Sequence, residues 1–470
     1  MHKLLPAGVA FALAAPFGVL ADTPSDIKAL RQEIEAIRAD YEARLQALEQ
    51  RLKAAEAAAA TPAPAAPAVT TAAPEPAAAP SATASTPPVV ASSGGGINSF
   101  NPAISLILSG LYTHTSQDPA NYQITGFPLP SDVQVGPGTQ GFSLTETELA
   151  FAASVDPWLR GAANIALEAN NTFSTEEAYI QTTSLGHGFS VKAGRFFSSI
   201  GYLNPQHMHT WDFVDNPLAY QAMLGTQYGD DGVELSWIAP TDQYIELAAE
   251  LGRGLTYPGS DTGTNGAGMT ALIAHTGGDV GDSSSWRAGV STLSAKADNQ
   301  DLVATNTAGS TVTNAFNGTT RVWVADAIWK WAPNGNATRT NFKLQSEYLR
   351  ATRNGTLVYD IGDANTPGAY HDVQSGWYLQ GVYQFIPHWR VGLRTEQLNP
   401  GTPDYGQNSA SLSTIDYRPH KDTLMVDFSP SEFSRFRLQF ARDRAHEGFP
   451  DSQFFLQYQS SLGAHGAHSF

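Results

Sequence analysis

The chain contains no cysteine among its 470 residues, and it has no long uninterrupted apolar run after its first 21 residues. The absence of cysteine is compatible with export, because nothing in the chain needs protection from stray oxidation. A membrane-spanning helix needs about 20 consecutive apolar residues. If the mature chain crosses a membrane, it must therefore do so with strands.

Basic residues are also scarce. The chain has 27 Lys and Arg against 44 Asp and Glu, which gives a formal net charge of -17. This balance disfavours nucleic acid as a partner, because phosphate groups are repelled by negative charge. No G-x-S-x-G motif occurs and no set of Ser, His and acidic residue stands out, so we expect the chain not to be an enzyme.

Glycine and aromatic residues, in contrast, are abundant: 42 Gly, 22 Phe, 17 Tyr and 9 Trp. The mean hydropathy is nevertheless below zero, at -0.23. An aromatic-rich chain that is not hydrophobic overall is typical of strands that alternate between lipid and water, and it is too polar for a helical membrane protein.

The N-terminus predicts three segments ahead of the main domain. Residues 1–21 have a positive start at Lys3, the apolar run LLPAGVAFALAAPFGVL and a small residue at Ala21, which together predict a secretory signal peptide rather than a short anchor. Residues 57–99 are rich in Ala, Pro and Thr, and this composition predicts a semi-extended linker.

Residues 22–56, between them, predict a coiled coil in the periplasm. Thr23 and Pro24 are suited to a helix start. Apolar residues then follow at a spacing of three and four, namely Ile27, Leu30, Ile34, Ile37, Tyr41, Leu45, Leu48 and Leu52. A single amphipathic helix is the alternative. If the segment forms a coiled coil, its apolar residues do not distinguish a dimer from a trimer.

Residues 100–470 predict an all-β fold, a 16-stranded antiparallel transmembrane β-barrel. In DTLMVDFSP, for example, Leu424, Val426 and Phe428 form one face and Thr423, Met425 and Asp427 the other. Sixteen such segments start near 102, 142, 159, 175, 189, 231, 243, 268, 285, 320, 340, 374, 389, 422, 433 and 452. An even number of strands is what a closed single-chain bacterial barrel requires.

The connections between these segments alternate in length. Long ones are expected at 114–140, 200–229, 254–266, 298–318, 353–370 and 400–420, and short turns such as IPH and SPSE separate them. This sorting is the outer-membrane arrangement, with both termini on the short-turn, periplasmic side. Trp158, Trp237, Trp331 and Trp389 lie beside short turns, where an aromatic girdle is expected.

The last segment ends in an outward apolar face that includes Leu456, Tyr458 and the C-terminal Phe470. This strand must close the barrel against the first. The terminal aromatic residue resembles the signature by which the assembly machinery reads bacterial outer-membrane barrels.

Charged residues on these strands must face the lumen, because a charge at mid-membrane on the lipid face costs about 2–4 kcal/mol for Arg or Lys. The early strands predict an acidic wall made of Glu146, Glu148, Glu168, Glu234, Glu246 and Glu250. The late strands predict a basic wall made of Arg390, Arg394, Arg435 and Arg437. An aqueous channel between the walls is expected, and a plugged lumen in which these groups pair is the alternative.

The stretch KAGRFFSSIGYLNPQHMHTWDFVDNPLAYQAMLGTQYGDD is the most distinctive of the chain. A strand ending in GRF, followed by Gly-Tyr and a long loop, resembles the phosphate-selective porin family. GRFFSSIGYLN, H-x-H, WDFVD and QYGDDGVELSW are similar to a related group of proteobacterial outer-membrane proteins described as zinc-regulated receptors or porins. The resemblance implies a homotrimeric 16-stranded porin in which loop 200–229 folds into the lumen and narrows it.

The charge of this region departs from that of the phosphate-selective porin family. Phosphate porins need Lys and Arg at the constriction, whereas residues 196–252 contain no basic residue and eight acidic ones. With Asp212, Asp215, Asp230 and Asp231 in the constriction loop, we expect a preference for cations or neutral solutes.

The motif HMHTWDFVD also offers metal ligands. His207, His209, Asp212 and Asp215 carry the nitrogen and oxygen donors that zinc accepts, so zinc is the cofactor to test, although none is certain. Histidines beside aromatic residues more often pack and hydrogen-bond. His465 and His468 form a second candidate pair near the C-terminus.

The sequence therefore predicts a passive diffusion channel in the outer membrane of a Gram-negative bacterium, in contact with outer-membrane lipid. A metal-responsive uptake receptor is an alternative, although the energy-coupled class needs about 22 strands and a plug domain. A plugged barrel that tethers the envelope, with the coiled coil contacting the cell wall, is another. No nucleic-acid partner is expected.

Overall fold

The computed structural model describes residues 102–145, 147–168, 172–260 and 267–463. The predicted signal peptide, coiled coil and linker lie outside the described residues, as do Glu146, His465, His468 and Phe470. Among the described residues, no helix is both long and apolar enough to cross a membrane.

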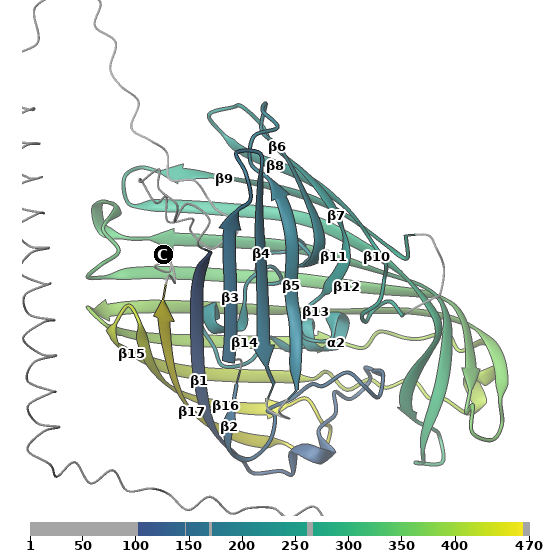
Figure 1. Ribbon diagram of the computed structural model, residues 1–470. Coiled ribbons are helices and arrows are strands. Elements are labelled where there is room, and N and C mark those ends of the chain that lie inside the picture. Colours follow the sequence, from purple (N-terminus) through teal and green to yellow (C-terminus); the bar gives the residue numbers. More distant parts are fainter. Residues whose placement is uncertain (1–101, 146, 169–171, 261–266, 464–470) are drawn as a thin grey trace, which may run out of the picture. The chain divides into compact units, whose positions relative to one another are not determined.

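The described residues form strands joined by turns and a few short helices (Figure 1). The strands are β1 Ala103–Thr115, β2 Gly141–Leu144, β3 Thr147–Ser154, β4 Leu159–Leu167, β5 Phe173–Thr182, β6 Phe189–Phe197, β7 Gly229–Ile238, β8 Tyr244–Gly252, β9 Met269–Val280, β10 Ser284–Thr305, β11 Thr311–Trp331, β12 Asn341–Tyr359, β13 Thr366–Ile386, β14 Trp389–Asn399, β15 His420–Ser431, β16 Ser434–Arg444 and β17 Asp451–Gly463. The helices are η1 Pro119–Asn121, η2 Met208–Thr210, α2 Leu218–Leu224, η3 Pro333–Gly335 and η4 Gly406–Ala410.

The strands close into one antiparallel barrel. Strand β1 pairs with β17 from Ser105↔Gly463 to Thr115↔Gln453, and on its other side with both β2 and β3. Because β2 and β3 lie along the same partner, they are two parts of one interrupted strand, and the 17 strands form a 16-stranded barrel. The predicted fold class is confirmed.

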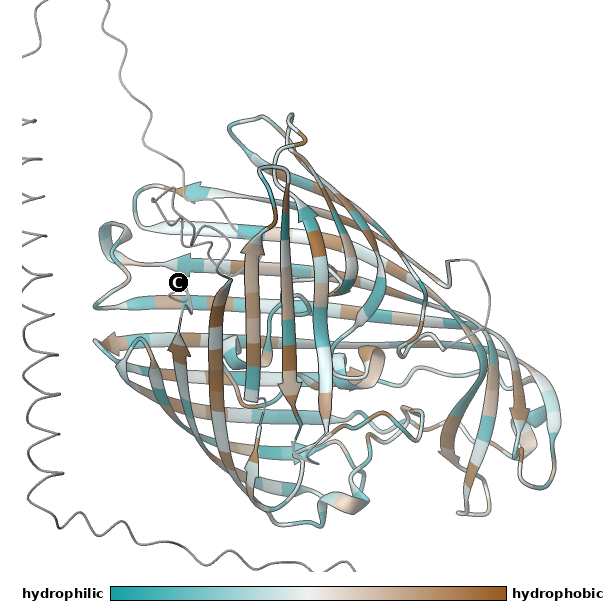
Figure 2. Cartoon of the chain, in the orientation of Figure 1, coloured by the Kyte–Doolittle hydropathy of each residue, from teal (hydrophilic) through white to brown (hydrophobic). Residues whose placement is uncertain are grey.

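Side chains alternate between a polar inside and an apolar outside. Figure 2 shows the corresponding bands of hydrophilic and hydrophobic residues along the strands. On β16, Phe436 and Phe440 face outward and are 44% and 50% exposed, whereas Arg437 and Gln439 between them face inward and are each 1% exposed. The barrel is thus apolar towards its surroundings and polar towards its lumen, as a barrel in lipid requires.

The short turns gather at one end of the barrel together with aromatic side chains. Trp158 stands at the start of β4 and is exposed, and the ring of Trp389 lies 4.7 Å from that of Phe428. The start of β1 and the end of β17 pair with each other at this same end. Both described ends of the barrel therefore lie on the short-turn side, as predicted.

Two of the connections predicted to be long are instead extensions of strands. β10 and β11 are joined by residues 306–310 and β12 and β13 by residues 360–365. These strands have 19–22 residues, whereas about 9–11 residues are enough to span a bilayer. They are longer because the backbone pairing continues beyond the bilayer, through residues that are polar. The ends of the two hairpins share a small core that includes Leu302, Phe316, Leu357, Tyr370 and Leu412.

Candidate functional site

The connection between β6 and β7, residues 198–228, lies inside the barrel, and we name it the constriction loop. It contains η2 and α2, and Figure 1 shows α2 among the surrounding strands. Every residue of α2 is buried. Pro217 precedes the helix and Gly225 ends it in the left-handed conformation at φ 63°, which a glycine adopts without steric cost. The resemblance drawn from the sequence implied this placement.

One side of the constriction loop packs on an apolar part of the barrel wall. Tyr220, Met223 and Leu224 belong to a buried cluster whose wall members include Leu293, Val322, Val324, Leu349, Tyr378 and Leu398. Fully burying a large apolar side chain stabilises by about 1.5–3 kcal/mol. The loop is therefore fixed to the wall by packing as well as by polar contacts.

The loop aspartates bind the basic wall. Asp212 is ion-paired with Lys343 and Arg390, and Asp215 with Arg394 at 2.9 Å and Lys421 at 2.6 Å. Burial alone raises the pKa of each aspartate, but the neighbouring cations outweigh it and hold both pKa values below the ordinary range. The two aspartates are therefore charged, and each is paired with cations of the wall.

Carboxylates of the wall, in turn, hold the loop backbone. Glu347 accepts hydrogen bonds from the N–H groups of Tyr202 and Leu203, each at 3.0 Å, and from the Tyr220 hydroxyl at 2.8 Å. Glu396 accepts from the Leu218 N–H at the start of α2, where the helix dipole favours negative charge. These contacts fix the loop near its start and at the first residue of α2.

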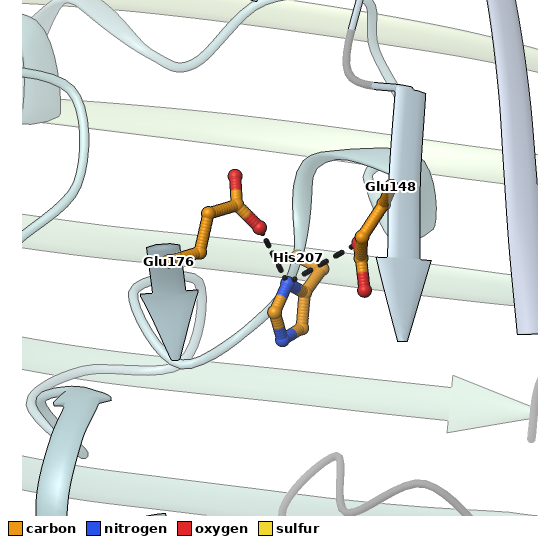
Figure 3. Close-up of side chains that lie close together, drawn as sticks. All are labelled: Glu148, Glu176 and His207. Atoms are coloured by element: carbon orange, nitrogen blue, oxygen red, sulfur yellow. Dashed lines mark hydrogen bonds and ion pairs between the residues drawn. The ribbon is translucent and has the colours of Figure 1, made fainter. Parts of the chain in front are cut away.

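His207 of the constriction loop lies among carboxylates of the opposite wall (Figure 3). Its Nδ1 is 3.5 Å from Glu148 and 3.2 Å from Glu176, and its Nε2 is 2.9 Å from Glu177. The ring of His209 stacks on that of His207 at 5.7 Å, and its Nδ1 is 3.0 Å from Glu148. Burial lowers the pKa of His207, but the surrounding carboxylates reverse this effect and raise the pKa well above its usual value.

The structure places most of the predicted wall residues on the inward side. Glu148, Glu234, Glu246 and Glu250 face the lumen, as do Arg390, Arg394, Arg435 and Arg437. Glu168 follows the end of β4, is exposed and accepts a hydrogen bond from Ser174. Leu456 and Tyr458 lie on the exposed outward face of β17, in the predicted orientation.

The predicted constriction residues are only partly brought together. Asp231 has the outward parity of Val233 and pairs with Arg195 at 2.7 Å on the outside of the barrel, so it does not line the constriction. Asp230 is buried beside the strand ends, where it accepts from the Tyr228 hydroxyl and the Gly254 N–H. The strand pairing that begins at Gly229 removes both residues from the loop.

The predicted metal ligands are also corrected. Asp212 and Asp215 do not join His207, because each is held by two cations on the other wall. Sequence reasoning missed Glu176 and Glu177, which do contact His207. Strict alternation would have turned only one of two consecutive glutamates inward, so no sequence signal could have found the pair.

Inward-facing side chains are nearly excluded from solvent at the level of the loop. Ser109, Gln345, Gln439 and Ala441 are buried although they come from widely separated parts of the wall. On the long-loop side, a cavity of about 600 Å³ is lined by residues that include Phe127, Leu129, Val303, Tyr405 and Ile415. The barrel thus has a hollow among its long loops and a narrow section at the constriction loop.

No family model matches this chain. An uncharacterized protein of Aquifex aeolicus (strain VF5) is 28% identical over 407 residues, which cover 79% of this chain and 80% of that protein. The resemblances to phosphate-selective porins and to the zinc-regulated group stay predictions.

Solved structures with a similar fold are OmpT of Vibrio cholerae in its trimer form, the outer membrane channel DcaP of Acinetobacter baumannii and the anion-selective porin from Comamonas acidovorans. Their TM-scores are 0.49, 0.47 and 0.45, at 10%, 14% and 11% identity. Each match covers 77% of this chain and 99%, 97% and 99% of the respective structure. The assignment of a closed barrel to this chain is based on the pairing of its own strands.

Proposed function

We propose that this chain is an outer-membrane channel for the passive diffusion of small solutes, with the constriction loop as its filter. The observation that carries the proposal is a closed barrel, apolar outside and charged inside, whose lumen is crossed by a loop that contacts the basic wall through Asp215 and the acidic wall through His207. An even-stranded barrel with long loops at one end and short turns at the other is the architecture of bacterial outer-membrane proteins.

A preference for cations is part of this proposal. The constriction loop neutralises the basic wall, because Asp212 and Asp215 pair with its cations. The loop meets the acidic wall instead with histidines and with hydroxyl and N–H donors, such as Ser199 donating to Glu234 at 2.5 Å. The field left in the lumen is therefore negative, which favours cations.

Because inward side chains are buried around the loop, we expect a small unit conductance. The test is to fold the purified protein, insert it into a planar bilayer, and record single-channel current and the reversal potential in a potassium chloride gradient. Stepwise currents with a reversal potential shifted towards potassium support the proposal. A reversal potential shifted towards chloride contradicts the proposed selectivity. Absence of current in the variant Asp215→Asn, in which the loop is expected to be released, contradicts the channel and favours the tether.

The remaining assignments are proposals of the same kind. We infer a homotrimer, tested by light scattering of the detergent-solubilised protein, and periplasmic placement of residues 22–56, tested by protease access in spheroplasts. We also propose that the chain is not an enzyme. Hydrolysis of lipid or peptide that one Ser or His substitution abolishes would contradict this.

A further inference from the structure

We propose that the lumen contains a binding site for a divalent transition-metal cation, formed by Glu148, Glu176 and the Nδ1 atom of His207. One ligand atom from each of these residues lies within 4.8 Å of the others. Figure 3 shows both carboxylates directed at the same ring nitrogen, from two different strands. The site is defined by binding alone and does not depend on the proposed channel activity.

The spacing of the donor atoms fits a metal of this class. The Nδ1 atom of His207 is 3.5 Å from Glu148 Oε2 and 3.2 Å from Glu176 Oε2. Nitrogen and oxygen ligands lie about 2.0–2.2 Å from zinc, so neighbouring ligands of a tetrahedral ion are about 3.3–3.6 Å apart. Both distances from Nδ1 match this spacing, and the two carboxylate oxygens, which lie within 4.8 Å of each other, can close onto one ion by side-chain rotation.

The opposite nitrogen of the same ring has the partner that a metal-binding histidine needs. Nε2 lies 2.9 Å from Glu177 Oε2, and the other oxygen of Glu177 accepts the Phe197 N–H at 3.1 Å. A carboxylate that receives the outer N–H of a histidine fixes the ring, and the inner nitrogen ligates once the metal displaces its proton. Glu177 is therefore a positioning residue for His207.

A β-bulge brings the two consecutive glutamates to one ring. Asn164 pairs with Glu177 and the next residue, Ile165, pairs with Thr175, so Glu176 is the extra residue on β5. In a regular strand, neighbouring side chains point to opposite faces. The bulge turns both carboxylates towards His207, and bulges that redirect a side chain in this way are frequent next to functional sites.

The charge of the cluster favours a divalent ion. Three carboxylates surround His207, and their side chains are only 2%, 18% and 12% exposed in Glu148, Glu176 and Glu177. Buried carboxylates are costly unless cations compensate them. A mixed set of imidazole and carboxylate donors suits zinc and its neighbours in the first transition row better than calcium or magnesium. His209 contacts Glu148 at 3.0 Å but does not belong to the convergent group of donors, which leaves the remaining ligand position to solvent.

The test is titration of zinc into the tag-free, chelator-stripped, folded full-length protein by calorimetry. We expect one ion per chain in the tight phase. Glu176→Gln and His207→Asn should weaken it by at least about 100-fold, and Glu177→Gln by about 10–100-fold, because it removes only the positioning carboxylate. His275→Asn is the matched control, since His275 is also buried and inward-facing but meets Glu246 at 3.1 Å without such a convergent set.

Each variant is checked by the heat-dependent shift in electrophoretic mobility that a folded barrel shows, so that loss of binding is not confused with misfolding. X-ray absorption of the zinc-loaded protein gives a second readout, and we expect a shell of nitrogen and oxygen with imidazole scattering that His207→Asn reduces. The proposal is overturned if the folded protein binds no tight zinc, or if the tight phase survives Glu176→Gln and His207→Asn unchanged.

Discussion

Replacing Asp215 with Asn should release the constriction loop from the basic wall. Asp215 receives Arg394 at 2.9 Å, Lys421 at 2.6 Å and the side-chain amide of Gln439 at 2.8 Å. The side chains of Arg394 and Lys421 are each 1% exposed, so neither can turn to water when its partner is lost. The substitution therefore removes a buried negative charge on which two buried positive charges depend.

The size of the effect follows from what remains. Removing one partner of a buried ion pair costs about 3–5 kcal/mol. Arg394 keeps Glu396 at 3.1 Å and Lys421 keeps Asp443 at 3.3 Å, so we use the lower figure, about 3 kcal/mol. Since about 1.4 kcal/mol corresponds to a factor of ten, the ratio of released to docked loop should rise about 100-fold.

Two measurements check this prediction. Hydrogen exchange of the α2 amides should accelerate about 100-fold in Asp215→Asn, because exchange follows the population of opened states. Single-channel conductance should rise above that of the original protein. Asp231→Asn is the control, because its pair with Arg195 lies outside the lumen with both side chains 42% exposed, and such a pair contributes about 0–1 kcal/mol. Equal exchange rates in the original protein and Asp215→Asn would refute the idea that this aspartate docks the loop.

Three further predictions concern selectivity, pH and folding. Glu246→Gln should reduce the potassium preference measured from the reversal potential, because it removes an inward carboxylate of the acidic wall, and an unchanged potential would count against that wall as the source. The lowered pKa values of Asp212 and Asp215 mean that their contribution to loop docking is present above about pH 4 and is lost only as the pH falls further. The part of the conductance change that depends on Asp215, measured as the difference between the original protein and Asp215→Asn, should therefore vary with pH only below about pH 4; an Asp215-dependent change near pH 6 would contradict this. Gly194→Ala should lower the yield of folded barrel in refolding assays, because Gly194 has φ 134° and a Cβ there would lie 2.2 Å from the Ala178 carbonyl oxygen, whereas Gly110→Ala, with open space around it, should fold normally.

Much of the barrel could be predicted from the sequence, because the alternation of side chains along a strand is a local property. On β16, the alternation predicts an outward face with Phe436, Leu438 and Phe440. It predicts an inward face with Arg435 and Arg437. The strand starts were predicted to within two residues for the same reason, except those of β11 and β13, which begin nine and eight residues before the predicted 320 and 374. The parts of β10 to β13 beyond the bilayer were not predicted, because no lipid imposes an apolar face there. The sequence of such a polar hairpin resembles that of a loop.

The candidate site was predictable in its composition but not in its partners. The sequence placed His207, Asp212 and Asp215 on one loop and the arginines on the far strands, and it correctly predicted opposed charges inside. It could not show that Asp215 pairs with Arg394, 179 residues later, because the side of the lumen a loop approaches depends on how its apolar face packs.

The sequence by itself therefore determined the sheet, its two faces and the sign of charge on each wall, since these follow from residue type and a period of two. Only the tertiary structure decided which charges neutralise each other and which residues converge. The pairing of β3 and β5 with β4 between them brings Glu148 and the bulged Glu176 to the loop histidine, and this encounter depends on strand register and on a single unpaired residue. A pattern of side chains encodes neither of these, because both are properties of the closed backbone.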